Sequence, residues 1–368
     1  MSNEMSKRGH IIYLFAMRSK NRFALPNSEV HLVLAPLRHV PIISSSLYVL
    51  AVLLFLPFYI AAKKFDYVIV EPGTSFVGLA LAPLLHLTNS KIVLDVRSTP
   101  LKIKDDFREH MHELLFRNSV MIAKRRFQGI TILTRLMKMQ ICSEFGLSSS
   151  FVGVWTSGVS DSVFDPHKYT GKELRKRLGL DHKFIVFHHG VLGKGRANDG
   201  LVGTIKAIAM LKNRFDDLLL FLLGEGDGLN ILERITKEND LEDTVRFHSK
   251  VDYFEVPSFI AMSDVAVVPL ANSPNWRFQC PLKLLEYLAM EKVVIVTDIL
   301  AHREVIGKSQ SGIYVQSIDP KEIAAAITFA HDNRDRLSDW GKAGRNIVED
   351  AYTWEKVARN LDEYLSSI

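Results

Sequence analysis

The segment CPLKLLEYLAMEKVVIVTD, residues 280–298, joins a short amphipathic helix to a strand-like apolar run. Pro281 suits the first turn of a helix, because the N–H that proline lacks would be unpaired there anyway. The run VVIVTD (293–298) is typical of a strand that is buried on both faces of a parallel sheet. A helix that leads into a buried strand is the repeating unit of an α/β fold.

The same alternation of apolar runs and helical patterns continues along the chain in both directions. We expect strands at 11–16, 29–35, 66–72, 91–97, 129–134, 151–155, 183–189, 218–224, 244–249, 264–270, 293–298 and 312–316. Segments such as 75–88, 105–126, 199–212 and 282–291 have the spacing of helices. Repeated strand–helix units predict parallel sheets with helices on both faces.

A polar stretch at 158–172, punctuated by Gly158, Pro166 and Gly171, interrupts this alternation. The 368-residue chain is long enough for two cores. We therefore expect two doubly wound, Rossmann-like domains, 1–158 and 159–350, and a C-terminal helix, 351–368, that crosses back to the first domain. Ligands bind at the carboxyl ends of the strands in such sheets, so a cleft between the two domains is expected.

Composition limits the kind of protein and its partners. Hydrophobic residues make up 47% and charged residues 24%, which is typical of a globular protein. Cys142 and Cys280 lie far apart, predict no disulfide framework or metal site, and fit a reducing, cytoplasmic setting. The net charge of +5 favours an anionic partner, either nucleic acid, a membrane surface or a diphosphate. No RNP-like or zinc-finger pattern is present, so nucleic acid is not expected.

Residues 40–62 contain no charged side chain and are followed by Lys63 and Lys64. The apolar stretch reaches the lower length limit of a membrane span, about 17 residues. Pro57 interrupts it, and predicted strands flank it on both sides. A spanning helix and a buried or membrane-resting helix are both open, and we expect the second.

The helix that begins after Pro281 carries a candidate phosphate site. Its first turn offers unpaired N–H groups and the positive end of the helix dipole to an anion. Lys283 lies in that turn, and Glu286 lies one turn further along the same face. A diphosphate bound at the helix start would place a ribose near this carboxylate. The alternative is an ordinary surface Lys–Glu pair, and spacing alone does not separate the two.

A second candidate is the glycine-rich loop in HHGVLGKGRANDG (188–200). Gly190, Gly193 and Gly195 permit a ligand to approach the backbone, and Lys194 and Arg196 add positive charge. LGEGDG (223–228) is a similar turn at a strand end. Both segments could equally be plain strand–helix connections.

The order of these pieces resembles glycosyltransferase family 4, whose members have the GT-B fold. The matching segments are SGV…FDP (157–166), the loop at 190–197, LGEGDG, VRFHSKV (245–251), FIAMSDVAVVPL (259–270), PLKLLEYLAMEKVVIVTD (281–298) and HREVI (302–306). The resemblance covers roughly residues 150–350 well and the first half loosely.

The resemblance implies a donor site for a nucleotide-diphosphate sugar. Arg196 and Lys283 would be the two catalytic cations on the diphosphate. The backbone around Leu282 would also meet the phosphates, and Gly190 and Lys194 of the glycine-rich loop are further candidates for donor binding.

The remaining implied contacts concern the rest of the donor and the acceptor. Glu286 would bind the ribose, and the backbone around Lys250 and Val251 would frame the nucleobase. Asp95, at the end of a predicted strand, is a possible contact to the transferred sugar or the acceptor, although aspartates at such positions also form turns.

Three positions depart from the family pattern. Phe278 replaces the first glutamate of the family's pair, Val191 replaces an arginine after the loop glycine, and Ala197 replaces a glycine. The first change leaves the donor sugar undetermined.

The beginning of the sequence also differs from the family. Family members place a strand and a glycine-rich loop before a helix that ends in RGH, whereas here Lys7-Arg8-Gly9-His10 leads directly into the strand at 11–16. We therefore expect the N-terminal sheet to have one strand fewer than the family, with a groove in its place, and we interpret residue 1 as an unnatural start for the fold.

The predicted function is the retaining transfer of a hexosyl unit from a nucleotide-diphosphate sugar to a hydroxyl acceptor. The acceptor would be a cell-surface glycan or lipid-linked saccharide, and the protein would be cytoplasmic and peripheral on the inner face of the membrane. No cofactor or metal is expected. Two alternatives stay open, namely a non-catalytic sugar-nucleotide-binding subunit and another GT-B enzyme such as a sugar-nucleotide epimerase.

Overall fold

The computed structural model describes residues 1–18, 29–38, 44–98, 107–193, 196–274 and 276–368. The chain forms two compact units. Unit 1 comprises Met1–Thr156 together with Glu355–Ile368, and unit 2 comprises Ser157–Trp354. The boundaries expected from the sequence lie at 158 and 350.

Unit 2 is built on one six-stranded sheet in the order β12-β11-β10-β7-β8-β9, in which every neighbouring pair is parallel. All six strands lie where the apolar runs predict them. Their bounds are β7 Phe184–His189, β8 Leu218–Leu223, β9 Val245–His248, β10 Val265–Val268, β11 Val293–Thr297 and β12 Gly312–Val315. β8 and β10 are buried along their whole length, which explains their continuous apolar sequence.

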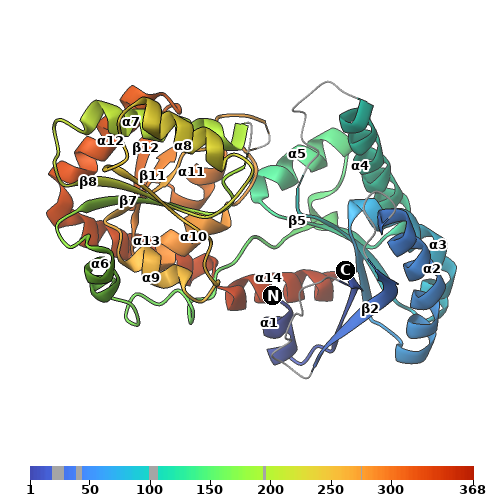
Figure 1. Cartoon of the computed structure of the whole chain (residues 1–368). Helices are drawn as coiled ribbons and strands as arrows, with labels where there is room; N and C mark the ends of the chain where they lie inside the picture. The colour runs from blue at the N-terminus through green and yellow to red at the C-terminus, as the bar shows by residue number, and fades with distance from the viewer. Residues whose placement is uncertain (19–28, 39–43, 99–106, 194–195, 275) are drawn as a thin grey trace. The chain divides into compact units, whose positions relative to one another are not determined.

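Helices cover both faces of this sheet (Figure 1). One face packs against α7 (Arg196–Leu211), α8 (Leu229–Glu238) and α12 (Pro320–Asp332). The other carries α9 (Val256–Ala261), α10 (Leu282–Ala289) and α13 (Leu337–Ala351). The unit also contains α6 (Lys172–Leu178) and α11 (Leu300–Ile306). The core between the first face and its helices is aliphatic, with Leu201, Ile205, Leu220, Val267 and Ile323 among its buried members.

The two glycine-rich turns of unit 2 pack directly on each other through their backbones. The Leu192 N–H donates to the Glu225 carbonyl (3.0 Å), and the Gly228 N–H donates to the Leu192 carbonyl (2.8 Å). Gly224 has a φ of +150°, and a Cβ there would lie 1.9 Å from the carbonyl oxygen of Gly190. The glycines of 223–228 therefore serve this close approach, and they fix the loop that follows β7.

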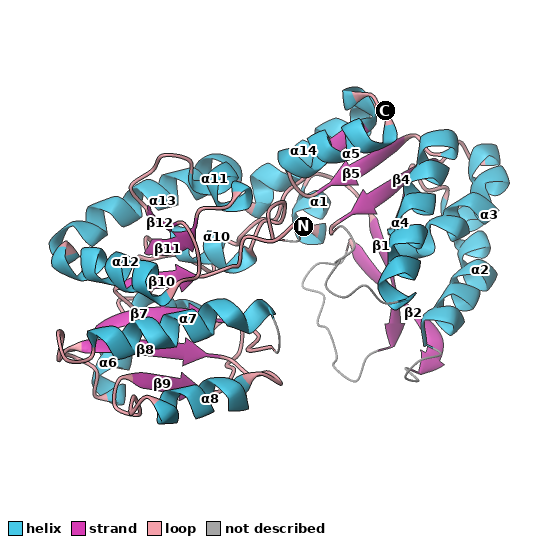
Figure 2. Cartoon of the chain, turned by 90° about the horizontal axis from the view of Figure 1, so that it is seen from above, coloured by secondary structure: helices cyan, strands magenta, loops and turns pink. Residues whose placement is uncertain are grey.

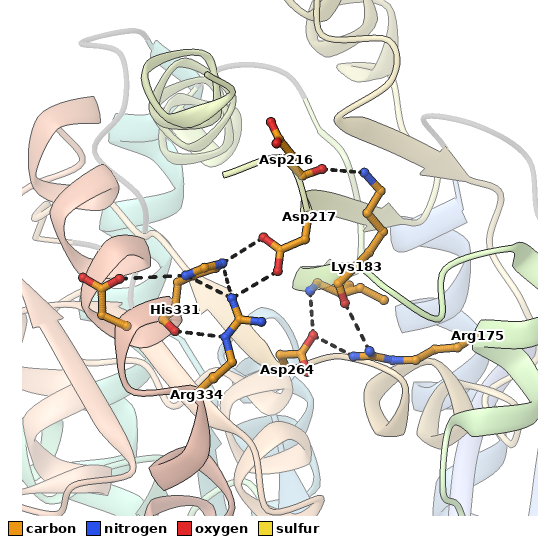
Figure 3. Close-up of polar contacts among 9 residues, drawn as sticks. Arg175, Lys183, Asp216, Asp217, Asp264, His331 and Arg334 are labelled. Atoms are coloured by element: carbon orange, nitrogen blue, oxygen red, sulfur yellow. Dashed lines mark hydrogen bonds and ion pairs between the residues drawn. The ribbon is translucent and has the colours of Figure 1, made fainter. Parts of the chain in front are cut away.

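Two clusters of charged side chains lie at the edge of the sheet where the strands begin, opposite to the edge formed by their carboxyl ends (Figure 3). Asp264, before β10, accepts from the Arg175 guanidinium (2.6 Å) and from the Ile185 N–H (2.7 Å). Asp217, before β8, accepts from His331 (2.8 Å) and Arg334 (3.1 Å). These contacts tie α6, α12 and the strand starts together, away from the carboxyl edge.

The described strands of unit 1 form two separate parallel sheets. β1 (Ile12–Arg18) pairs with β2 (Val30–Arg38). The second sheet has the order β3-β4-β5-β6, with bounds Tyr67–Val70, Lys91–Val96, Gly129–Ile132 and Val152–Val154. The six strands lie where the sequence predicts them, but the single N-terminal sheet that we expected is divided, because β1 pairs only with β2 and β3 only with β4 among the described residues.

The helices of unit 1 are α1 (Ser2–Lys7), α2 (Ser44–Lys63), α3 (Ser75–Leu87), α4 (Phe107–Arg126) and α5 (Arg135–Phe145). α14 (Trp354–Ser367) packs on the second sheet through Leu361 and Leu365, in a cluster that includes Met5 and Val93. The Tyr364 hydroxyl donates to the Phe151 carbonyl (2.6 Å) and accepts from the Ile130 N–H (3.2 Å). The end of the chain is thereby fixed to unit 1.

The packed glycine turns give a testable prediction about stability. Gly224→Ala should lower the free energy of unfolding of unit 2 by roughly 2–4 kcal/mol, because the new methyl group meets backbone that cannot move aside and φ is positive. Gly179→Ala is the matched control, since Gly179 also has a positive φ of 69° but has no atom within 4 Å of the position that a methyl group would take. It should cost only about 1 kcal/mol. Equal urea midpoints for the two variants would contradict the steric argument.

Candidate active site

The carboxyl ends of β7 and β10 form the natural ligand position in unit 2. These neighbouring strands lie where the chain order of the sheet reverses, since β8 follows β7 on one side and β10 adjoins it on the other. Open parallel sheets bind ligands outside such a switch point. β7 ends in His188 and His189, and the loop after β10 leads to Pro281 and α10.

Lys283, the second residue of α10, points to the end of β7. Its ammonium donates to Nε2 of His188 at 3.2 Å, and Nδ1 of His188 lies 3.0 Å from the Val267 carbonyl. A carbonyl can only accept, so Nδ1 carries the proton and Nε2 is the acceptor for the ammonium. Burial, and then the charge of Lys283, lowers the pKa of His188 well below its ordinary value, so the ring is neutral.

The ammonium of Lys283 is itself poorly solvated. Burial lowers the pKa of Lys283 to about 8, and the negative charge of Glu286 only partly opposes this. Among the residues that the structure describes, Lys283 forms no ion pair with a carboxylate. A cation in this state is stabilised by any anion that approaches it.

Glu286 is held by a second hydrogen-bonded chain. Its Oε2 lies 2.9 Å from Nε2 of His189, and Nδ1 of His189 lies 2.9 Å from the Tyr287 hydroxyl. The same hydroxyl accepts from the His189 N–H at 2.9 Å. Tyr287 is fully buried, so its proton needs an acceptor, and Nδ1 is in place to accept it. Nε2 then carries the ring proton and donates it to Glu286.

The structure brings three of the predicted donor-site residues together. Lys283 and Glu286 lie on the same face of α10, and Gly190 lies beside them with a φ of +131°. A Cβ at Gly190 would lie 3.0 Å from Nζ of Lys283, so glycine is what leaves space at this ammonium. Leu282 is the first residue of α10, and its backbone therefore contributes to the helix N-terminus, as predicted from Pro281.

Other predicted donor residues are placed less completely. Lys194 lies outside the described residues. Arg196 is the first residue of α7, and its side chain is not described. Lys250 and Val251 follow β9 at the same edge of the sheet as β7. The Lys250 side chain is 76% exposed and forms an ion pair with Glu225 at 2.9 Å.

Asp95 lies in unit 1, at the end of β4, and its side chain is used internally. It is 7% exposed, and its Oδ1 accepts from Thr131 (2.8 Å) and from the Trp155 indole (3.0 Å). The Arg97 guanidinium stacks on Trp155 at 3.7 Å. Burial raises the pKa of Asp95 despite the nearby charge of Arg97. The carboxylate therefore links β4, β5 and the segment after β6, while its contact with a sugar stays a prediction.

Three residues of this network were not singled out from the sequence: His188, His189 and Tyr287. Two signals were available. The histidines end a strand immediately before a glycine, and the tyrosine follows Glu286 directly. Their roles depend on contacts between residues 79 to 98 positions apart in the sequence, and local spacing cannot supply these.

The arrangement is chemically suited to an anion with a hydroxyl-bearing group beside it. The N-terminus of α10 and the Lys283 ammonium present positive charge in one place. Oε2 of Glu286 is occupied by His189, which leaves Oε1 to accept hydrogen bonds from a bound ligand.

Part of unit 2 matches a known protein family. Residues 172–347 match the family model described as glycosyl transferases group 1. This segment, just under half of the chain, is similar to the glycosyl transferases group 1. The match contains β7, β10 and α10, and hence all the site residues described in unit 2.

Two relatives illustrate the sequence similarity. A GDP-mannose-dependent alpha-(1-6)-phosphatidylinositol monomannoside mannosyltransferase from Mycobacterium tuberculosis is 26% identical over 64% of this chain and 61% of its own length. The uncharacterized glycosyltransferase MJ1607 from Methanocaldococcus jannaschii is 24% identical over 78% of this chain and 71% of its own length. The chain thus spans about three fifths of the length of the mycobacterial relative.

Solved structures share the architecture. HepE from Anabaena, solved in complex with UDP, matches 92% of this chain and 86% of its own with a TM-score of 0.71 at 16% identity. A glycosyltransferase from Rickettsia africae matches 100% of this chain and 93% of its own with a TM-score of 0.73 at 15% identity. The predicted GT-B fold is confirmed.

The depressed pKa of Lys283 predicts how anion binding depends on pH. The charged form prevails below about pH 8 and is lost above it, so the affinity for inorganic pyrophosphate should fall by roughly tenfold between pH 7 and pH 9. Lys283→Arg should remove this loss, because a guanidinium stays charged. Calorimetric titration measures the affinity of both proteins at each pH. The ionisation of pyrophosphate affects both proteins alike, so the comparison between them corrects for it. Parallel pH profiles for the two proteins would contradict the assignment.

Proposed function

We propose that the protein transfers a hexosyl unit from a nucleotide-diphosphate sugar to a hydroxyl acceptor with retention of configuration. In this reaction the bond between the anomeric carbon and the diphosphate oxygen breaks, and the acceptor oxygen bonds to the anomeric carbon as its proton leaves. The nucleoside diphosphate departs with additional negative charge.

The observation that carries the proposal is the Lys283 ammonium at the start of α10, without a carboxylate partner among the described residues. Charge that is fixed in a poorly solvated position stabilises a leaving diphosphate more than an exposed lysine would. Arg196, at the start of α7, is the second proposed cation. Glu286 is proposed to bind the ribose through Oε1, and the backbone at Lys250 and Val251 to frame the base.

We propose further that no metal ion or cofactor takes part. Both proposed cations belong to the chain, so the leaving group can be stabilised without a bridging divalent ion. Added EDTA should then leave turnover unchanged.

Removing either cation should weaken transfer. Lys283→Ala and Arg196→Ala should each lower kcat/KM by roughly 10²–10³-fold, the usual effect of losing one preorganised charge-stabilising group. Lys342→Ala is the control, since Lys342 is exposed and forms an ion pair with Asp339, a neighbour on the same helix α13. Near-normal kcat/KM in both site variants would refute the donor-site assignment.

Two alternatives make different predictions for the purified protein with a nucleotide sugar. A non-catalytic binding subunit would bind the donor and release no nucleoside diphosphate. A sugar-nucleotide epimerase would change the sugar while it stays joined to the nucleotide. The similarity of the family segment to glycosyltransferases favours transfer.

The acceptor is proposed to be a cell-surface glycan or a lipid-linked saccharide, met by a cytoplasmic protein on the inner face of the membrane. The name of the mycobacterial relative refers to phosphatidylinositol monomannoside, which is a lipid, and this supports a membrane-presented acceptor here. Within the described ranges, the structure holds no helix with the length and apolarity to cross a membrane.

A peripheral association can be tested by extraction. Carbonate or high-salt washing should release most of the protein from isolated membranes, because contacts with headgroups are electrostatic and an interfacial helix is not trapped in the bilayer. Release that requires detergent would instead favour a spanning helix in the 40–62 region.

A further inference from the structure

One surface of unit 1 is apolar although it faces solvent. It consists of the outer sides of α2 and α3, which lie side by side in both overall views (Figures 1 and 2). The exposed apolar side chains are Leu50, Leu54, Phe55 and Phe58 of α2 and Phe76, Leu79 and Leu87 of α3. We call this set the α2–α3 face. Phe58 is 73% exposed and Leu87 is 83% exposed, so neither side chain belongs to the edge of the hydrophobic core.

The spacing of the exposed residues shows that the face is continuous along α2. Leu50, Leu54 and Phe58 recur every fourth residue of α2, which aligns them on one side. The sides of both helices that are turned to the core are also apolar, since Ile60 of α2 and Val77 and Leu85 of α3 are buried. Helices that are apolar all round need a second apolar environment besides the core.

The α2–α3 face contains no acidic side chain. α2 has Lys63 as its one charged residue, and α3 has no Asp, Glu, Lys or Arg. A protein partner usually meets a mixed surface with a polar rim around it. A face free of charge over two helices instead matches the boundary between acyl chains and headgroups.

Positive charge gathers at one edge of this face. The strands β3, β4 and β5 are parallel, and α2, α3 and α4 each lead into the start of one of them. The C-terminal ends of the three helices therefore lie along the same edge of unit 1. Lys63 and Lys64 are exposed at the end of α2, and Arg125 and Arg126 at the end of α4. Asp66 is the acidic residue between Lys64 and β3.

A groove connects the apolar and the basic parts of this surface. It has a volume of about 460 Å³ and lies between α3 and α4. Leu79 and Pro83 of α3 line it together with His86, and Arg126 lines it from α4. An apolar wall beside a guanidinium suits a lipid whose headgroup is anionic.

We propose that the α2–α3 face is the surface by which the protein rests on a bilayer that contains anionic lipids, with Lys63, Lys64, Arg125 and Arg126 at the headgroups. The proposal rests on the membrane location given under the proposed function and assigns it to particular side chains. It also extends the surface beyond the uncharged 40–62 stretch to α3 and to the end of α4. The basic edge supplies most of the affinity for anionic lipid, which high salt weakens, and the apolar side chains add a shallow contact that does not depend on headgroup charge.

The test is flotation of the full chain with vesicles of phosphatidylcholine alone and with added phosphatidylglycerol, without sugar donor or acceptor. Wild-type protein should bind the anionic vesicles more tightly. Phe58→Ser together with Leu87→Ser should weaken binding to both vesicles by at least about tenfold. Lys63→Ser together with Arg126→Ser should weaken binding only to the anionic vesicles, by about fivefold for each charge removed.

Two matched controls separate the face from general effects of the same substitutions. Phe254→Ser removes an aromatic side chain that is 66% exposed in unit 2, and Lys342→Ser removes an exposed lysine there. Both should bind vesicles like the wild type. All variants should keep the wild-type melting temperature, because the changed side chains are exposed.

Several outcomes would overturn the proposal. These are an absence of vesicle binding, equal effects of face and control variants, and a wild-type dimer that the face variants convert to monomers. The last outcome would make the face an interface between two copies of the chain. Because no sugar substrate is present, each of these results leaves the proposed transfer reaction untouched, and loss of transfer in the Lys283 variant leaves vesicle binding untouched.

Discussion

The site of unit 2 depends on one hydrogen bond between a lysine and a neutral histidine. The Lys283 ammonium can donate to Nε2 of His188 only while that nitrogen carries no proton. The Val267 carbonyl ensures this, since it takes the proton of Nδ1. Val267 lies on β10 and His188 on β7, so the pairing of these two strands determines the protonation state of the ring. A shift of register between the two strands would move the Val267 carbonyl away from Nδ1 of His188. Nε2 would then no longer be fixed as the hydrogen-bond acceptor of the Lys283 ammonium.

The two charged side chains of α10, Lys283 and Glu286, do not neutralise each other. Glu286 could neutralise Lys283 from one turn away, yet its Oε2 is engaged by His189. The carboxylate is thereby engaged by one histidine and the ammonium by the other. Two adjacent histidines, pointing to opposite sides of β7 as strand geometry requires, keep the two charged groups of α10 apart. Burial makes this arrangement costly in free energy, because it disfavours the charged form of Lys283 and lowers the pKa of the ammonium to about 8.

Much of the fold follows from local sequence, and the reason is physical. Buried parallel strands such as LLLFLL (218–223) must be apolar on both faces, so each described strand is visible as an apolar run. The position of Lys283 and Glu286 on one helix face follows equally from Pro281 and the helical period.

The hydrogen-bond partners of the site residues do not follow from local sequence. The bond from Tyr287 to His189 spans 98 residues and depends on how α10 packs on the sheet. The division of the unit 1 strands into two sheets is likewise a matter of pairing, which no local pattern encodes.

The glycine turns show how the same sequence feature can serve two purposes. LGEGDG resembles a ligand-binding loop, but its glycines admit the backbone of the 190–193 loop, with Gly224 against the carbonyl of Gly190. Gly190 in turn leaves room at the Lys283 ammonium. The first set of glycines therefore positions the loop, and the single glycine at its start opens the site. Under the proposed function, a substitution in either place would disturb anion binding, but by different routes. At Gly224 the effect would be accompanied by lost stability, whereas at Gly190 a methyl group would press directly on the cation that the ligand needs. The two kinds of glycine can thus be distinguished by comparing affinity with stability, and sequence similarity alone treats them as the same motif.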